Sequence, residues 1–239
     1  MDFPLYSGGA NRSIKKVIAR AATGGILGRD SHERVVVRAL NSISFDVQEG
    51  DRVGLVGHNG SGKSTLLRLI AGIYEPTQGS IAVKGSVTSM LSISMGIEKE
   101  ATGLENIYLR GRLVGIPPRK MRAMIDEIVD FAGLGDYLHL PLRTYSSGMA
   151  MRLAFAVSTS IEADIILMDE WLSVGDAEFV EKAKRRLGKM VNGARVVILA
   201  SHNRKLLESQ CNKIIRLDHG NISEYSEISP ADQSSQPVQ

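Results

Sequence analysis

A glycine-rich run in the first third of the chain carries the clearest chemistry. Gly57-His58-Asn59-Gly60-Ser61-Gly62-Lys63-Ser64 fits the pattern G-x-x-x-x-G-K-[ST]. The glycines allow successive backbone N–H groups to point into one concavity that holds a β-phosphate, and a following helix adds its positive end. Lys63 is expected to reach the β- and γ-phosphates, and the Ser64 hydroxyl to ligate Mg²⁺. The run therefore predicts a site for a nucleoside triphosphate.

Two adjacent carboxylates further along the chain supply the second half of this chemistry. Asp169 and Glu170 follow four apolar residues, 165–168, which predict a buried parallel strand whose carboxyl end faces the ligand. Asp169 is expected to hold the Mg²⁺ shell, and Glu170 to polarise a water for in-line attack on the γ-phosphate. The alternative is a helix N-cap followed by a first-turn acid. The glycine-rich run upstream favours the phosphate site.

Alternating strands and helices must position these residues, and such alternation is typical of an α/β fold with a largely parallel sheet. The phosphate loop falls between a predicted strand at 52–56 and a predicted helix that ends near Gly72. Further strands are expected at 35–37 and 43–47 as an antiparallel pair, and at 80–83, 165–168, 195–200 and a hairpin from 214–217 to 222.

A helical block interrupts the sheet between about Gly96 and Ser160. Within it an apolar stripe at helical spacing ends at Gly133 and Gly135 and predicts core packing rather than a binding face; its residues are Met121, Met124, Ile125, Ile128 and Val129.

Amino-acid composition limits the classes of protein to which the chain can belong. The 239 residues are 43% hydrophobic and 23% charged, which excludes disordered, collagen-like and membrane-spanning chains. A net charge of +3 with 5% aromatic residues is weak support for nucleic-acid binding, so no nucleic-acid partner is expected. One cysteine, Cys211, excludes an intrachain disulfide framework.

The basic excess is concentrated at the N-terminus. Residues 1–38 hold seven Lys or Arg against three acids. Residues 12–21 have helical apolar spacing and predict a basic amphipathic helix, either an ordinary solvated surface helix or one near anionic lipid. A transit peptide is a third reading. Residues 229–239, rich in Ser, Gln and Pro, predict a disordered tail.

The order of motifs along the chain resembles the series that marks ABC ATPases. Tyr145-Ser146-Ser147-Gly148-Met149 resembles the signature sequence of that superfamily, and it lies between the phosphate loop and 165–170. Ser173-Val174-Gly175-Asp176 and Ser201-His202-Asn203 then follow in the expected order. A phosphate-loop kinase is a weaker reading, because the signature run and His202 have no role there.

This resemblance implies an α/β fold, a P-loop ABC ATPase cassette with an antiparallel β subdomain and a helical subdomain. The implied organisation is a basic N-terminal strand/helix insert at 1–38, an ABC nucleotide-binding domain at 39–228 with its helical subdomain at about 96–160, and the tail at 229–239.

The resemblance also implies site roles in a head-to-tail homodimer, with each ATP held between the phosphate loop of one copy and the signature helix of the other. His202 is expected to contact the γ-phosphate, with Glu170 as the other catalytic residue, and Ser64 and Asp169 as the Mg²⁺ ligands. A purely structural His202 and a solvated Asp176 are the alternatives. The implied ATP-binding residues are Gly57, His58, Asn59, Gly60, Ser61, Gly62, Lys63, Ser64, Thr65, Ser146, Ser147, Gly148, Asp176 and Tyr6.

Several runs resemble the ATP-binding subunit of bacterial polysaccharide exporters in particular: residues 102–109, 145–149, 152–157 and 169–176. The implied function is ATP hydrolysis that drives a lipid-linked polysaccharide across the inner membrane. O-antigen or capsule is the expected polysaccharide. The implied partners are an integral membrane permease, a second cassette and, indirectly, the polysaccharide. The implied location is the cytoplasmic face of the bacterial inner membrane, as a peripheral subunit. The alternative is a soluble ABC ATPase of DNA maintenance or translation.

Two family features are displaced in this sequence. No Gln occurs between Ser80 and Gly103, where the superfamily has a metal-contacting glutamine, and Ser92 or Ser94 stands nearby. No aromatic residue lies between Val35 and Ile43 to stack on adenine, so Tyr6 or Phe3 is expected to take that role.

Overall fold

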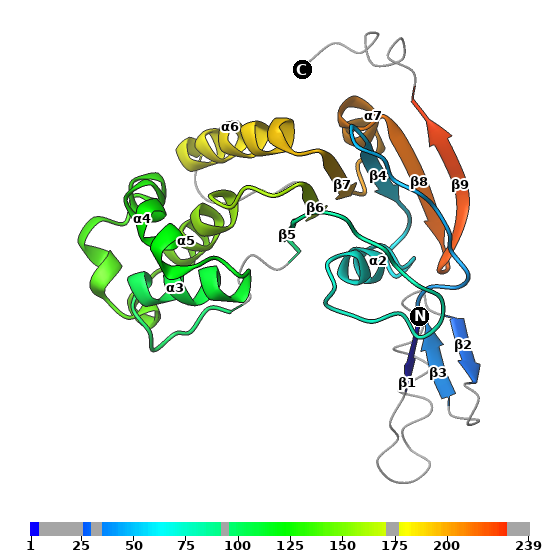
Figure 1. Ribbon diagram of the computed structural model, residues 1–239, viewed down its shortest axis with the longest axis horizontal. Coiled ribbons are helices and arrows are strands. Elements are labelled where there is room, and N and C mark those ends of the chain that lie inside the picture. Colours follow the sequence, from blue (N-terminus) through cyan, green and yellow to red (C-terminus); the bar gives the residue numbers. More distant parts are fainter. Residues whose placement is uncertain (5–25, 30–34, 92–95, 171–176, 229–239) are drawn as a thin grey trace. The chain divides into compact units, whose positions relative to one another are not determined.

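The computed structural model describes residues 1–4, 26–29, 35–91, 96–170 and 177–228, and these fall into two compact units. The first unit contains residues up to 85, together with 167–171 and 195 onwards, and the second contains 86–166 and 172–194. Figure 1 shows the course of the chain. Among the described residues, no helix combines the length and the apolar character needed to cross a membrane.

A mainly parallel sheet forms the centre of the first unit. β4 (Arg52–Val56) lies between β7 (Val196–Ala200) and β8 (Lys213–Asp218) and runs parallel to both. β9 (Asn221–Glu227) pairs antiparallel with β8, and the last part of β6 (Ile165–Asp169) lies beyond β7. This sheet brings the carboxyl ends of β4 and β7 to one edge.

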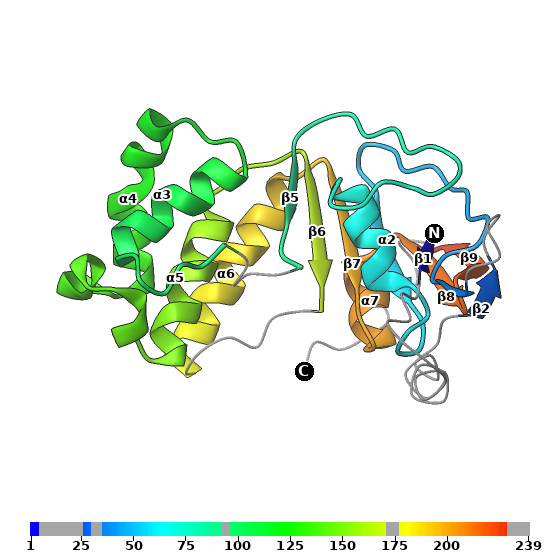
Figure 2. The ribbon, with the colours of Figure 1, turned by 90° about the horizontal axis from the view of Figure 1, so that it is seen from below.

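Burial explains why these segments are strands. Every residue of β7 is buried, and so are the three central residues of β4 and of β6. Continuous apolar runs of this length are typical of strands covered on both faces. The covering helices are α2 (Lys63–Ile70) and α7 (Arg204–Gln210), which lie on opposite faces of the sheet (Figures 1 and 2).

A second, antiparallel sheet forms near the N-terminus of the first unit. β3 (Val35–Arg38) is its central strand, between β1 (Asp2–Pro4) and β2 (Ile26–Arg29). The prediction that 35–37 pairs with 43–47 is therefore wrong. Residues 43–47 alternate between half-buried and exposed, but they form no strand ladder. The predicted helix at 12–21 and the predicted disordered tail at 229–239 lie outside the described residues.

Helices dominate the second unit. α3 (Gly103–Leu113), α4 (Pro118–Ala132) and α5 (Ser147–Thr159) pack around a shared core, two 3₁₀ turns (Gly135–His139 and Leu142–Thr144) join α4 to α5, and α6 (Ala177–Gly193) follows. β5 (Val87–Ser89) lies beside the start of β6 in this unit. The unit thus extends beyond the predicted helical block at 96–160.

The apolar stripe of α4 packs as the sequence indicates. Met121 and Ile128 are fully buried, and the three other stripe residues pack against the same core. Gly133 ends the helix in the left-handed conformation, with a φ of 63°. By contrast, the predicted strand at 80–83 is absent: Ile81 and Val83 are both exposed, so the alternation there has no buried face.

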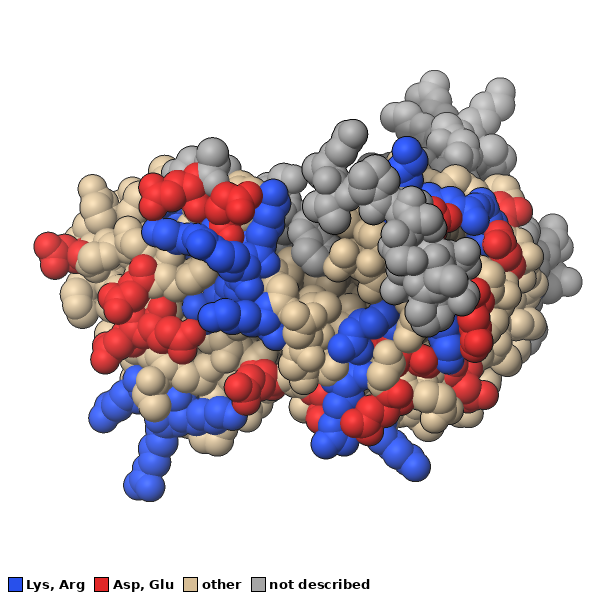
Figure 3. Space-filling view, turned by 90° about the horizontal axis from the view of Figure 1, so that it is seen from above, with Lys and Arg blue, Asp and Glu red and all other residues tan. Residues whose placement is uncertain are grey.

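Acidic and basic side chains are interspersed on the face shown in Figure 3. On α6, Lys182 pairs with Glu178 and Lys184 pairs with Glu181 along the exposed surface. Exposed pairs of this kind contribute little to stability.

Candidate functional site

The phosphate loop joins β4 to α2, which is the strand–loop–helix setting that the sequence predicts. Gly60 and Gly62 have positive φ angles of 80° and 110°. The Ser61 amide donates to the His58 carbonyl at 3.1 Å and tightens the turn. The loop therefore ends at the N-terminus of α2, where backbone N–H groups are available to an anion.

Close packing explains two of the glycines. A Cβ at Gly57 would overlap the Leu217 carbonyl and the Ser61 side chain. A Cβ at Gly62 would overlap Leu40 and the Ala39 carbonyl, and the positive φ of Gly62 independently disfavours any side chain. Only glycine fits the present backbone at these two positions.

Lys63 is buried in the hollow of the loop. Its Nζ donates to the Gly57 carbonyl at 2.7 Å and to the His58 carbonyl at 3.0 Å. Burial lowers the pKa of Lys63, while the nearby charges of Asp169 and Glu170 oppose that shift. A cationic amine is thus held by neutral carbonyls at the place where phosphate oxygens would provide stronger, charge-assisted acceptors.

Ser64 and Asp169 meet at the same edge of the sheet. Ser64 Oγ donates a hydrogen bond to Asp169 Oδ2, although the two residues are 105 positions apart. A hydroxyl and a carboxylate are hard oxygen donors of the kind that Mg²⁺ uses beside phosphates. The two residues therefore fit the role of magnesium ligands in chemistry and in position.

Glu170 and His202 form a second pair beside this one. His202 Nε2 lies 3.3 Å from Glu170 Oε1, and both side chains are exposed. The Glu170 backbone has a φ of 69°, and its amide donates to the Ala200 carbonyl at 2.8 Å at the end of β7. A glutamate in this left-handed conformation is uncommon and often marks a functional position.

The predicted signature residues lie at the N-terminus of α5 in the second unit. Ser146 caps the helix, with its Oγ accepting from the Met149 amide at 3.2 Å. Ser147 and Gly148 form the first turn. Among the described residues beyond the helix's own backbone, the nearest atom to a Cβ at Gly148 is Ser146 Oγ, at 3.8 Å. The first turn of α5 therefore has room for a ligand beside Gly148.

Some predicted residues cannot be compared with the structure. Asp176 and Tyr6 lie outside the described residues, as do Ser92 and Ser94. The backbone of Phe3 pairs with Val37 in the N-terminal sheet. The residues that the structure brings together are Gly57 to Thr65, Asp169, Glu170 and His202, all in the first unit.

The turn between β8 and β9 also touches the phosphate loop, and sequence reasoning missed this contact. Gly220 donates its amide to the Ser61 carbonyl at 3.0 Å, and His58 Nε2 lies 3.1 Å from Asp218 Oδ1. The hairpin itself is predictable from the sequence, but no motif indicates where its turn packs.

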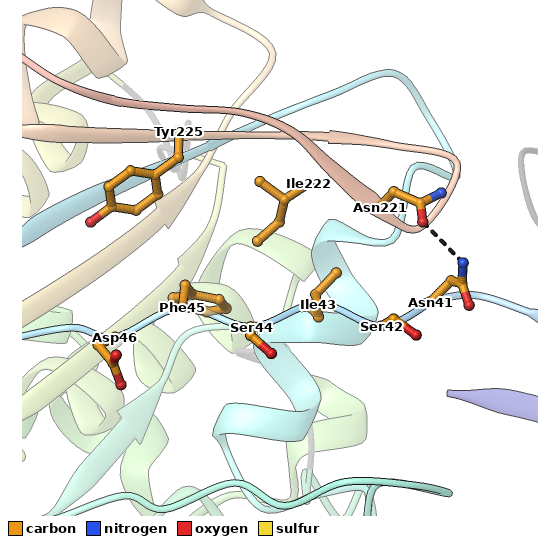
Figure 4. Close-up of a pocket in the computed structure, with 9 residues that line it drawn as sticks. All are labelled: Asn41, Ser42, Ile43, Ser44, Phe45, Asp46, Asn221, Ile222 and Tyr225. Carbon is orange, nitrogen blue, oxygen red and sulfur yellow. Dashed lines mark hydrogen bonds between the residues drawn. The ribbon is translucent and has the colours of Figure 1, made fainter.

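A separate hollow lies between residues 41–46 and β9 (Figure 4). It has a volume of about 460 Å³ and is lined on one side by Asn221, Ile222 and Tyr225. The Asn41 side-chain amide donates to Asn221 Oδ1 at 3.0 Å and closes one end. Among the described residues, no predicted catalytic or nucleotide-binding residue lines this hollow.

The fold and the site together define a class: a nucleoside-triphosphatase with a P-loop, a hydrogen-bonded Ser64–Asp169 pair and a carboxylate beside a histidine. Residues 40–173 match the family model described as ABC transporter.

Relatives place the chain more narrowly. It is 46% identical over 226 residues to the O-antigen export system ATP-binding protein RfbE of Yersinia enterocolitica, an alignment that covers 95% of this chain and 94% of that protein. It is 44% identical over 190 residues to the teichoic acids export ATP-binding protein TagH of Bacillus anthracis, covering 80% of this chain but only 34% of that relative. It is also 39% identical to the O-antigen export protein RfbB of Myxococcus xanthus, of which the chain covers 44%.

Solved structures confirm the fold. The dimeric post-hydrolysis state of the ATP-binding cassette MJ0796 bound to ADP and Pi superposes with a TM-score of 0.65 at 21% identity, covering 87% of this chain and 97% of that one. An ATP-binding subunit of an ABC transporter gives a TM-score of 0.66 at 20% identity, covering 85% and 88%. The chain belongs to the ABC transporter family, and it is the ATPase cassette of that family.

Proposed function

We propose that this chain is the ATP-hydrolysing subunit of an ABC exporter that moves a lipid-linked polysaccharide across the inner membrane. The observation that carries the proposal is the likeness to the O-antigen export protein RfbE along nearly the full length of both chains. The relatives named for teichoic acid export are covered over 34% to 56% of their own length, against 94% for RfbE, so O-antigen or capsule is the favoured cargo. The soluble ABC ATPase of DNA maintenance or translation does not fit these relatives.

The phosphate loop would hold the nucleotide through its backbone amides and Lys63. Transferring the Lys63 amine from two carbonyls to phosphate oxygens replaces neutral acceptors with charged ones, which strengthens its hydrogen bonds. Thr65 follows Ser64 in the first turn of α2, where its amide faces the same end of the helix. Nucleotide affinity should therefore depend strongly on Lys63.

The Ser64–Asp169 pair would provide the protein ligands for Mg²⁺. When bound, Mg²⁺-ATP supplies the γ-phosphoryl group that is transferred and a metal charge that offsets negative charge on the phosphate oxygens. Asp169 is held for this role by the buried strand that precedes it, since residues 166–168 are almost completely excluded from solvent.

Glu170 would accept the proton of the attacking water. Its position directly after Asp169 places a carboxylate next to the metal site, and its exposed side chain is accessible to water. His202, 3.3 Å away, would orient that carboxylate and donate to the γ-phosphate. The two residues would then act as one unit.

The open turn at Ser146, Ser147 and Gly148 would complete the site from a second copy of the chain. Serine hydroxyls and backbone amides at a helix N-terminus suit a γ-phosphate. Asp176 would lie at the seam between the two copies, and Tyr6 would stack on adenine. The homodimer would sit beneath a membrane permease, at the cytoplasmic face of the inner membrane.

Genetic complementation tests the proposal. In cells that lack this gene, we expect the surface polysaccharide to be lost and its lipid-linked form to accumulate inside. The unchanged gene should restore export, whereas the gene for Glu170→Gln should not. A variant with a substitution at the exposed His139 is the control and should restore export fully. Recovery of the protein in the membrane fraction should require the co-expressed permease. Normal surface polysaccharide in the deleted strain would contradict the proposal.

A further inference from the structure

Three exposed side chains with metal-binding chemistry converge beside the phosphate loop: His58, Asp218 and His219. His58 Nε2 lies 3.1 Å from Asp218 Oδ1, and His219 Nε2 lies 3.9 Å from the same oxygen. One ligand atom from each residue lies within 4.8 Å of the others. None of the roles assigned to the nucleotide site uses Asp218 or His219.

Backbone contacts bring these residues together. Asp218 ends β8 and Asn221 begins β9, so His219 and Gly220 form a two-residue turn with φ angles of 45° and 80°. The Gly220 amide donates to the Ser61 carbonyl at 3.0 Å, and the Gly220 carbonyl accepts from the Asn41 amide at 2.8 Å. The turn is therefore anchored on the loop that carries His58.

Short contacts bring the His58 ring against the β8–β9 turn. His58 Nδ1 lies 2.8 Å from the Asn59 carbonyl, and His58 Nε2 lies 3.1 Å from Asp218 Oδ1. The centroids of the His58 and His219 rings are 4.6 Å apart, and the two rings are tilted by 54°. The Nε2 atom of His58 therefore lies on the side of the ring where the two other side chains gather.

The second imidazole makes the cluster a set of metal ligands rather than a simple pair. A first-row transition metal ion gains from each nitrogen donor that is added to a carboxylate. The Nδ1 contact of His58 with a backbone carbonyl is also the arrangement that orients metal-binding histidines. Because all three side chains are exposed, small rotations can bring their ligand atoms to the roughly 2.0–2.2 Å bond lengths of a zinc site.

We propose that His58, Asp218 and His219 form a binding site for a first-row transition metal ion such as Zn²⁺ or Ni²⁺. Two imidazoles and one carboxylate select these ions over Mg²⁺, which prefers oxygen ligands. Three protein ligands leave at least one coordination position for water or another small ligand. The bound ion links the phosphate loop to the β8–β9 turn, so it restrains the loop at His58.

Calorimetric titration of the full-length, untagged, nucleotide-free protein with NiCl₂ or ZnCl₂ tests the site directly. We expect one ion per chain, with no comparable heat from MgCl₂ and a raised melting temperature. His219→Asn and Asp218→Asn should each weaken binding by about tenfold or more. Asparagine suits position 219 because it tolerates the positive φ. His139→Asn, which removes an exposed histidine elsewhere, should leave binding unchanged.

Hydrogen exchange provides the second measurement. Exchange of the amides at 57–62 should slow when the ion binds, and should stay unchanged in His219→Asn. Undiminished binding in His219→Asn and Asp218→Asn, or binding lost only in Asp169→Asn, would place the ion elsewhere and overturn the proposal. Absence of binding to the unchanged protein would also overturn the proposal.

Discussion

At the scale of single residues, Glu170 combines an exposed carboxylate with an uncommon backbone conformation. Its φ of 69° carries a cost of about 1 kcal/mol or more for a residue with a side chain. The buried end of β6 and the hydrogen bond to Ala200 hold it there. In this conformation the Glu170 carboxylate lies 3.3 Å from His202, which suits the proton transfer proposed for it.

His202→Ala should slow ATP turnover by roughly 10–100-fold, because Glu170 loses the group that orients it. ATP affinity should change much less, since the phosphate loop supplies most of the binding. Steady-state turnover measured beside equilibrium nucleotide binding separates the two effects. Equal turnover in His202→Ala and the unchanged protein would show that His202 has no role in catalysis. His139→Ala serves as the control for loss of a histidine.

Cys211 should be chemically inert in the folded protein. Burial raises the pKa of its thiol to about 12, and the charge of Arg52 opposes the shift only in part. The reactive thiolate is therefore almost absent at about pH 8, and the side chain is also inaccessible. A disulfide reagent should label the native protein far more slowly than the protein in denaturant. Rapid labelling in native buffer would contradict this burial.

The residues that meet at the proposed nucleotide site could be named from the sequence because each belongs to a short motif with a mechanism. For Lys63, Asp169 and Glu170, the neighbouring residues in the sequence were enough to predict a role. The contact between His58 and Asp218 could not be predicted, since it joins residues 160 positions apart through the packing of a hairpin turn. Pairings of this kind depend on tertiary structure and leave no local pattern.

At the scale of elements, one buried amide holds the segment before α3. Asn106 Oδ1 accepts from the Glu98 amide at 2.8 Å, and its Nδ2 donates to the carbonyls of Glu98, Ala101 and Thr102. The side chain is 1% exposed. It therefore satisfies backbone groups that have little access to water.

Asn106→Ala should lower the free energy of unfolding by about 2 kcal/mol, because it leaves buried backbone groups without partners. Urea unfolding of the purified variant provides the measurement. Asn192→Ala is the matched control, since Asn192 is exposed on α6 and its loss should cost almost nothing. Equal stability of the two variants would show that the Asn106 network contributes no net stability.

Elements with strong periodicity and clear end signals were predictable, and those that depend on pairing were not. The stripe and terminal glycine of α4 specify that helix locally. Residues 43–47 alternate as a strand should, yet the chain before them turns at Ser42, where φ is 47°, and β3 pairs with β1 and β2 instead. Alternation identifies an extended segment, but it does not identify the strand beside it.

At the scale of the whole molecule, the proposed dimer places the first turn of α5 of one copy against the nucleotide that the phosphate loop of the other copy binds. Gly148→Asp tests this. An acid in the first turn of a helix favours folding, and a side chain at this position meets open space, so the variant should fold. Its negative charge should repel the γ-phosphate and abolish ATP turnover.

Gly148→Asn, which has the same shape without the charge, should retain more activity than Gly148→Asp. Size-exclusion chromatography of Glu170→Gln with Mg²⁺-ATP should show a dimer, and the added Gly148→Asp should return it to a monomer. A persistent dimer in the double variant would argue against the role of α5 in joining the two copies.

Residues 57–65, 169–170 and 202 are proposed to bind and hydrolyse ATP, and a paired measurement separates binding from hydrolysis. ATP binding and ATP turnover are measured on the unchanged protein, Lys63→Ala and Glu170→Gln. We predict that Lys63→Ala loses both activities, whereas Glu170→Gln binds ATP normally and does not hydrolyse it. Turnover by Glu170→Gln at the rate of the unchanged protein would contradict the account.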